Sequence, residues 1–183
     1  MLAKWDDLSD KQILDIGCGA GGWLRTLQEW GGEPEHLHGI DLLEDRIAQA
    51  KKMSPQIDYQ AISGWPIPFT EQSMDLVTAN TVFSSILDPE ARLGLAKEMN
   101  RVVRSNILIY DFRISHPKNP DTIGIRKNEI RRLFPNFKIH MQTLTLAPPI
   151  QRKLAPLSPL LAYACEVLLP FLRTHAVYLL TRE

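Results

Sequence analysis

A glycine-rich loop between two regular elements constrains this chain more than any other feature of its sequence. Residues 12–16 form an apolar run typical of a β-strand, and residues 22–30 have helical periodicity. Three glycines lie in the turn between these runs, and a fourth begins the helical run. Gly17, Gly19 and Gly22 fit the G-x-G-x-x-G spacing, in which glycines let a ligand approach the backbone closely. This unit predicts a ligand of the nucleotide type at the start of an α/β domain.

Apolar runs continue to alternate with helical patterns through the rest of the chain. Strands are expected over residues 12–16, 37–40, 58–62, 75–79, 106–110, 137–146 and 175–181, and helices over residues 22–30, 44–53, 89–103, 125–134 and 157–172. The alternation predicts βαβ units, right-handed crossovers and a mainly parallel sheet, with the two final strands as the exception. We expect one domain over residues 1–183, with its ligands beyond the C-terminal ends of the strands.

Composition argues against several other classes of protein. The 21 Lys and Arg balance 21 Asp and Glu, which removes the simplest electrostatic case for a nucleic-acid partner. Cys18 and Cys165 are too far apart and too few for a disulfide framework or a metal site. The N-terminus lacks a signal-peptide pattern, and the most apolar stretch, residues 157–172, is too short for a membrane span. We expect a cytoplasmic protein in which this stretch is a helix covering the core rather than an element on a membrane surface.

Two carboxylates beside the loop narrow the choice of ligand. Asp15, two residues before Gly17, would repel a pyrophosphate on the loop and suits a ligand with a cationic group. Asp41 ends the second strand, where a carboxylate can accept both ribose hydroxyls, and Leu42 would cover one face of an adenine. S-adenosylmethionine (SAM) combines these groups. A loop-bonding carboxylate at Asp15 and a helix N-cap at Asp41 remain open as alternatives.

The chain resembles the class I SAM-dependent methyltransferases over nearly its whole length. Residues 13–22 (Ile-Leu-Asp-Ile-Gly-Cys-Gly-Ala-Gly-Gly) are similar to the family's first motif, and residues 39–42 to its acidic second motif. Residues 65–77 and 98–104 are similar to the segments before strands four and five. The resemblance implies a Rossmann-like fold with a seven-stranded, mostly parallel sheet, an antiparallel last strand and helices on both faces. It also implies SAM as methyl donor and S-adenosylhomocysteine (SAH) as product.

The resemblance also implies a wider set of cofactor contacts. Besides the two carboxylates and Leu42, these are Gly17, Cys18, Gly19, Trp23, Ile62, Ser63, Gly64 and Asn80. Cys18 is expected to contribute only its backbone and its small size. Asn80 is expected to contact the methionine part of the cofactor with its backbone. Ser63 stands where many relatives carry an acid that bonds the adenine amino group, and its hydroxyl can accept one hydrogen bond.

Candidates for acid–base chemistry follow the fifth strand. Asp111 or His116 could take a proton from a hydroxyl acceptor, although a turn carboxylate and a surface histidine are equally open interpretations. Residues 80–83 are not the Asn-Pro-Pro-aromatic tetrad of enzymes that methylate adenine or glutamine amino groups. Methyl transfer from a sulfonium is an in-line displacement that needs mainly positioning, so a base is required only for a weakly acidic acceptor.

The predicted function is methyl transfer to a small molecule or biosynthetic intermediate. Relatives usually place one or two helices before the first strand, whereas few residues precede residue 12, so we expect a reduced N-terminal cap. A homodimer or a partner subunit would then complete the active site. Three alternatives stay open: a non-catalytic SAM-binding or partner-activating subunit, a nicotinamide-dependent oxidoreductase, and a methyltransferase acting on protein or RNA.

Overall fold

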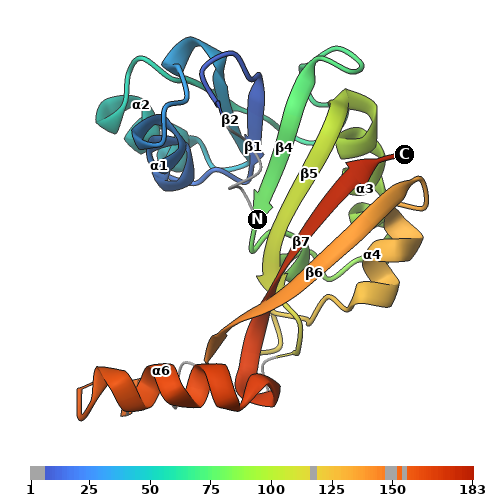
Figure 1. The fold of residues 1–183 in the computed structure, drawn as a ribbon. Coiled ribbons are helices and arrows are strands. Elements are labelled where there is room, and N and C mark those ends of the chain that lie inside the picture. The colour runs from blue at the N-terminus through green and yellow to red at the C-terminus, as the bar shows by residue number, and fades with distance from the viewer. Residues whose placement is uncertain (1–6, 116–118, 147–151, 154–155) are drawn as a thin grey trace.

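A seven-stranded sheet forms the centre of the molecule in the computed structural model, which describes residues 7–115, 119–146, 152–153 and 156–183. Its spatial order is β3-β2-β1-β4-β5-β7-β6 (Figure 1). The strands are β1 (Ile13–Ile16), β2 (Leu37–Asp41), β3 (Asp58–Ala61), β4 (Met74–Asn80), β5 (Val103–Phe112), β6 (Phe137–Leu146) and β7 (Arg173–Arg182). The first five are parallel, and β7 is antiparallel to both β5 and β6. The predicted fold class is confirmed.

Helices connect the strands at nearly the positions that the periodicity predicts. They are α1 (Gly22–Glu29), α2 (Glu44–Met53), α3 (Pro89–Val102), α4 (Lys127–Leu133) and α6 (Pro159–Leu168), with the 3₁₀ turns η2 (Pro34–His36), η3 (Phe83–Ser85) and η4 (Pro170–Leu172). The start of α3 illustrates the local signals, because the Asp88 carboxylate accepts a hydrogen bond from Glu90 N and Pro89 occupies the first turn.

Two apolar layers cover the two faces of the sheet and bury its central parallel strands. Leu14 of β1 belongs to the cluster that contains Met99 of α3, while its neighbour Ile13 belongs to the cluster that contains Leu24 of α1. Successive strand residues point to opposite faces, so every residue of β1 is buried. This packing holds the C-terminal ends of the central strands in fixed positions, where they can orient the residues of a ligand-binding site.

The apolar segment near the C-terminus does not cover the core, and the expectation of a core-covering helix over residues 157–172 is wrong. The β6–β7 hairpin continues past the end of β5, because Leu146 pairs with Arg173 beyond the pair of Phe112 with His175. The connection therefore leaves the sheet at its edge, and α6 lies apart from α1–α4 (Figure 1). In the parts of the chain that the structure describes, no helix combines the length and apolar character needed to cross a bilayer.

Candidate ligand-binding site

The C-terminal edge of the parallel strands brings the predicted carboxylates and the glycine loop together. Asp15 pairs in register with Gly39 of β2 and Thr78 of β4, so the ends of these three strands are level. The loop that follows is pinned to β2, because Gly17 N and Cys18 N both donate to the Ile40 carbonyl, at 2.8 and 3.0 Å. A parallel sheet thus places the end of β1, the acid of β2 and the end of β4 at one edge.

The glycines of the loop meet different surroundings. Gly17, Gly19 and Gly21 have φ of 69°, 53° and 76°, a region that side chains rarely adopt. A Cβ at Gly17 would lie 2.6 Å from Val82 Cγ2, and one at Gly21 would lie 2.2 Å from the Tyr59 hydroxyl oxygen. A Cβ at Gly19 would meet nothing within 4 Å. The protein's own packing therefore requires the first and third glycines, whereas the space beside Gly19 is open to a ligand.

Asp15 is a buried carboxylate held by polar side chains of β4. Thr78 Oγ1 donates to Asp15 Oδ1 at 2.6 Å, and Asn80 Nδ2 donates to the same oxygen at 3.4 Å. Burial raises the pKa of Asp15 to about 7, and the nearby charge of Asp41 adds to the increase, against the hydrogen bonds. A cationic group brought close to Asp15 would favour its ionised form, so the site is suited to bind a cation with release of a proton.

Asp41 holds the loop and the start of the next helix with its two oxygens. Oδ2 accepts a hydrogen bond from Gly19 N at 2.8 Å, and Oδ1 accepts one from Leu43 N at 3.0 Å, directly before α2. The side chain is half-buried, and that of Leu42 beside it is exposed. Asp41 is therefore not the N-cap of α2, because that position is Leu43 and no side chain caps it. The Asp41 carboxylate instead holds the turn before the helix, at the edge where a ribose is expected.

The segment after β3 carries the predicted residues Ile62, Ser63 and Gly64 to the same edge. Ile62 N donates to the Asp41 carbonyl at 3.0 Å, which joins this segment to the end of β2. The Ser63 side chain is exposed, and Gly64 has a φ of 141°. This contact places the exposed Ser63 hydroxyl near the acidic end of β2.

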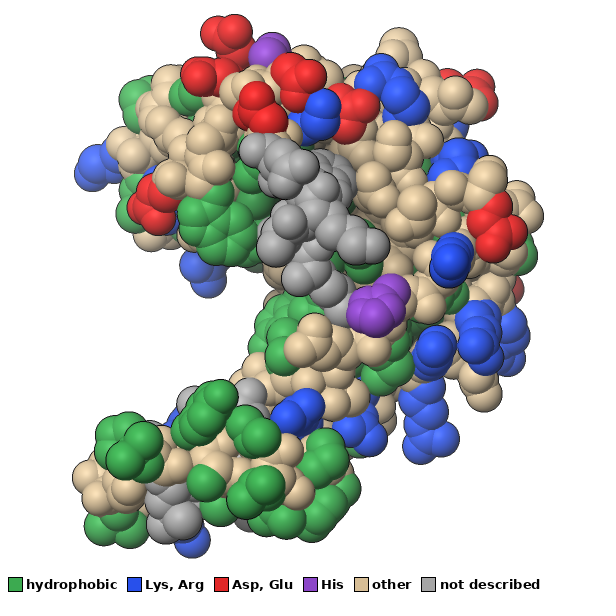
Figure 2. All heavy atoms as spheres, in the orientation of Figure 1, with side chains coloured by type: hydrophobic (Ala, Val, Ile, Leu, Met, Phe, Trp, Pro, Cys, Tyr) green, Lys and Arg blue, Asp and Glu red, His purple; other side chains and the backbone are tan. Residues whose placement is uncertain are grey.

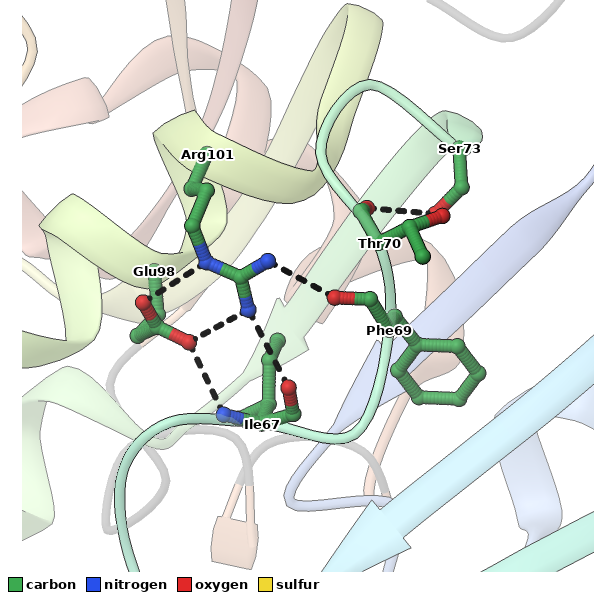
Figure 3. A network of polar contacts seen from close by, with 6 residues as sticks. All are labelled: Ile67, Phe69, Thr70, Ser73, Glu98 and Arg101. Carbon is green, nitrogen blue, oxygen red and sulfur yellow. Dashed lines mark hydrogen bonds and ion pairs between the residues drawn. The ribbon is translucent and has the colours of Figure 1, made fainter.

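A polar network from α3 fixes the rest of that segment (Figure 3). Glu98 Oε2 accepts from Ile67 N at 2.8 Å, and the Arg101 guanidinium donates to the carbonyls of Phe69 and Ile67 at 2.7 and 3.1 Å. Arg101 also donates to both oxygens of Glu98, at 2.9 and 2.7 Å, and these bonds lower the pKa of Glu98. Sequence reasoning missed this anchoring role, although the two residues lie three apart on a predicted helix, the spacing at which side chains meet.

Thr78 is a second residue that sequence reasoning missed. It is fully buried in β4, where the sequence predicts an apolar strand, and its hydroxyl is the closest donor to Asp15. The available signal was a polar residue inside an apolar run, because buried hydroxyls need a hydrogen-bond partner.

Cys18 and Trp23 pack into the protein. The Cys18 side chain lies in the apolar cluster under α1 and α2, and burial raises the pKa of its thiol. The Trp23 ring meets the Trp30 ring edge-on, with centroids 5.6 Å apart. Its indole N–H has no acceptor within the described part of the chain. The small side chain of Cys18 thus packs between the glycine loop and the apolar core.

The two acid–base candidates have different outcomes. Asp111 is fully buried, and its carboxylate accepts hydrogen bonds from Ser84 N at 3.1 Å and Phe112 N at 2.8 Å. Burial raises the pKa of Asp111, against these bonds. Asp111 thereby connects η3 to the end of β5. This is the structural role of a turn carboxylate, which the sequence left open as the alternative to acid–base chemistry. His116 lies outside the residues that the structure describes.

An aromatic group lies where β5 ends beside β7. The His175 ring stacks on Tyr110, with centroids 5.1 Å apart and planes 6° apart, and it also contacts Phe112 at 4.0 Å. The Tyr110 hydroxyl is hydrogen-bonded to Thr145 Oγ1 at 3.0 Å. Burial lowers the pKa of His175, which favours the neutral ring. The sequence did not predict this group.

Comparisons with known proteins agree with this arrangement. Residues 13–106 match the family described as "Methyltransferase domain". The demethylmenaquinone methyltransferase of Lactococcus lactis is 29% identical over 140 residues, 74% of this chain and 53% of that protein. The ubiquinone biosynthesis O-methyltransferase of Hydrogenovibrio crunogenus is 30% identical over 100 residues, 52% of this chain and 40% of that protein.

Solved structures share the fold at low identity. The magnesium protoporphyrin IX methyltransferase of Synechocystis PCC 6803, solved with bound SAM, superposes with a TM-score of 0.69 at 13% identity. The match covers all of this chain and 74% of that one. The chain spans about half the length of the curated demethylmenaquinone methyltransferases that it matches.

Proposed function

The chain belongs to the methyltransferase domain family, and from this premise we propose that it binds SAM and transfers the methyl group to a small-molecule acceptor. The observation that carries the proposal is the pair of carboxylates on either side of the glycine loop. Asp15 is buried at one end, and Asp41 bonds the Gly19 N–H at the other. A ligand with a cationic tail and a ribose matches this pair in both charge and hydrogen bonding.

The residues at the edge fit this cofactor. The open space beside Gly19 admits a ligand against the backbone, and Asp15 can neutralise an ammonium once it ionises. Asp41 would accept the ribose hydroxyls, and the exposed Leu42 would cover the adenine. The other proposed contacts are Gly17, Cys18, Trp23, Ile62, Ser63, Gly64 and Asn80. Bound SAM supplies a sulfonium with an electrophilic methyl group and a neutral leaving group.

The chain's own contribution to the reaction is positioning. Holding donor and acceptor in line can lower a barrier by about 7–11 kcal/mol without any proton transfer. Asp111 contributes indirectly, because it fastens η3 beside the site through the Ser84 N–H. His116 stays the proposed base for a hydroxyl acceptor.

We infer an aromatic acceptor of the biosynthetic-intermediate type. Of the two curated relatives above, one is named for demethylmenaquinone and the other for ubiquinone biosynthesis. In this chain, the half-buried rings of Tyr110 and Phe112 lie on the buried His175 ring near the end of β5. Aromatic rings favour offset or edge contacts with other aromatic rings, which supports a ring-containing acceptor over an aliphatic one.

Calorimetry with SAH and with NADH tests the cofactor. We expect micromolar binding of SAH, and at least ~10-fold weaker binding by Asp15→Ala, because the carboxylate that pairs with the ammonium is removed. Asp121→Ala, which removes an exposed carboxylate elsewhere on the chain, is the control and should bind as the wild type. Tighter binding of NADH than of SAH would replace this proposal by the nicotinamide-dependent alternative.

Methyl labelling tests the acceptor class. The protein is incubated with SAM carrying a tritiated methyl group and a lysate, and label is counted in organic-extractable small molecules and in precipitated macromolecules. We expect the label in the small-molecule fraction. Label in protein or RNA would contradict the acceptor proposal, and SAH binding without any transfer would favour the non-catalytic subunit.

A further inference from the structure

Among the residues that the structure describes, exposed apolar side chains gather on one face of α6 and the turns beside it. Leu160, Tyr163, Val167 and Leu168 recur at the spacing of a single helical face. With Leu157 and Phe171 at its ends they form what we call the α6 apolar face, whose side chains have exposed fractions between 47% and 81%. Single exposed apolar residues are ordinary, but a contiguous face of six marks an interaction surface.

Charge is distributed unevenly along this chain, although its net charge is zero. Residues 1–100 carry 16 Asp and Glu against 8 Lys and Arg, whereas residues 101–183 carry 5 against 13. Figure 2 shows most of the acidic side chains in view at the end of the molecule opposite α6, together with some basic ones. A group of basic side chains lies toward α4, and single basic side chains lie beside α6. The apolar face therefore lies in the half of the chain with a formal charge of +8.

Two exposed basic residues lie shortly before α6 in the sequence, and others lie elsewhere in this half of the chain. Arg152 and Lys153 precede α6 and are both exposed. Further exposed basic residues of this half are Arg126, Arg131, Arg132 and Lys138. The only acidic residue between positions 130 and 182 is Glu166. An apolar helix face with Arg and Lys at one end is typical of helices that lie in the interface of an anionic bilayer.

We propose that the α6 apolar face and the basic residues beside it bind the surface of an anionic phospholipid membrane. With ten residues, α6 is too short to span the bilayer and lies parallel to its surface. Tyr163 and Phe171 have the amphipathic or aromatic side chains that favour the interfacial layer. Arg152 and Lys153 would contact lipid phosphates.

A second copy of this chain is the less suitable occupant of the same face. Face-to-face packing of two α6 helices would bring together two halves that each carry a formal charge of +8. Like charges at close range oppose association, whereas an anionic lipid surface attracts them. The charge distribution thus favours lipid over self-association.

Membrane docking would also orient the molecule. The α6 helix lies at the C-terminal edge of the parallel strands, and the face in view is hollowed between α6 and the body (Figures 1 and 2). A bilayer in contact with α6 would therefore lie next to the ligand edge rather than next to the acidic end of the molecule.

Co-sedimentation of the full chain with vesicles tests this proposal without any turnover. The probes are vesicles of phosphatidylcholine alone and vesicles with equal parts phosphatidylcholine and phosphatidylglycerol. We expect binding to the second kind, at least ~10-fold weaker binding to the first, and release by salt, because the attraction is electrostatic as well as apolar.

Two pairs of variants assign the binding to its residues. Leu160→Glu/Leu168→Glu should lower vesicle binding at least ~10-fold, because it interrupts the apolar face. Its control, Met53→Glu/Leu87→Glu, changes two exposed apolar residues elsewhere and should lose much less. Arg152→Glu/Lys153→Glu should also weaken binding strongly, at about fivefold for each charge lost near the surface.

The control for the basic pair makes the same change of net charge in the other half of the molecule. Lys51→Glu/Lys52→Glu alters two exposed lysines of α2 and should leave most binding intact. Equal binding to both kinds of vesicle, equal loss in both charge variants, or no binding to either would overturn the proposal. So would a concentration-dependent dimer that Leu160→Glu/Leu168→Glu dissolves in the absence of lipid binding, which would assign the face to a second copy.

Discussion

Replacing Asp15 by Asn should stabilise the protein at alkaline pH while weakening its ligand binding. The amide has the shape of the carboxyl group and keeps an oxygen that can accept the hydrogen bonds of Thr78 and Asn80. It differs in that it cannot ionise inside the protein. Asp15→Asn therefore isolates the cost of placing a negative charge at this buried position.

The size of the effect follows from the pKa of Asp15. Burial raises it from an ordinary value of 3.8 to about 7. This gap of about three units, at ~1.4 kcal/mol per unit, corresponds to about 4 kcal/mol of native-state destabilisation when the group is fully ionised. Below the ordinary value the group is protonated in both the native and the unfolded states, and the variant and the wild type should be equally stable.

The sign of the pH dependence is set by where the proton is held. Between about pH 4 and pH 7 the native state keeps the proton that the unfolded state releases, so the unfolding free energy of the wild type falls as pH rises. Above pH 7 both states are ionised and the loss is complete. Urea denaturation should therefore find Asp15→Asn more stable by about 4 kcal/mol near pH 8.5 and by about 1 kcal/mol near pH 4.5.

Two further measurements test the reasoning. The exposed carboxylate of Asp121 serves as the control, and Asp121→Asn should show no such pH-dependent gain. SAH binding by Asp15→Asn should weaken at least ~10-fold, since a neutral amide cannot pair with an ammonium. A stability difference that is the same at both pH values, or a destabilised variant near pH 8.5, would show that Asp15 does not hold its proton in the native state.

Substitutions in the glycine loop and in the α3 network test the remaining structural arguments. Gly21→Ala should lose about 3 kcal/mol of stability by urea denaturation, because its Cβ would collide with the Tyr59 hydroxyl in addition to the cost of its positive φ. Gly19→Ala should lose only about 1 kcal/mol, from φ alone, yet weaken SAH binding; unchanged binding would show that no ligand lies there. Arg101→Ala should lose about 2 kcal/mol because it removes four charge-assisted hydrogen bonds, whereas exposed Arg104→Ala should lose under ~1 kcal/mol, and equal losses would contradict the anchoring role.

The sequence determined most of the strands and helices and several of the residues that meet at the C-terminal edge of the parallel strands. The residue ranges predicted for the second helix and the sixth strand, 44–53 and 137–146, coincide with α2 and β6. The glycine loop and the carboxylates Asp15 and Asp41 were also evident from the residues alone. Periodicity, turn residues and acids at strand ends involve residues that are close together in the sequence. They can therefore be recognised without knowing how distant segments pack.

The partners of these residues were decided only by the tertiary structure. Thr78 donates to Asp15 across 63 positions of the chain, and Glu98 bonds Ile67 N across 31. Such pairs form because parallel register and helix packing bring distant segments together. Local sequence patterns do not predict such long-range contacts. The sequence therefore indicated Asp15 as a candidate site residue, but not that Thr78 is its hydrogen-bond donor or that burial raises its pKa.

The apolar segment that forms α6 shows most clearly the difference between what the sequence determines and what only the tertiary structure decides. Its composition predicted a helix, and a helix forms over Pro159–Leu168. Whether that helix would cover the core depended on how far the β6–β7 hairpin continues past the end of β5 and on which faces of the sheet α1–α4 already occupy. A run of apolar residues has the same helical pattern in either place, so only the assembled sheet decided that α6 presents its apolar face to the surroundings.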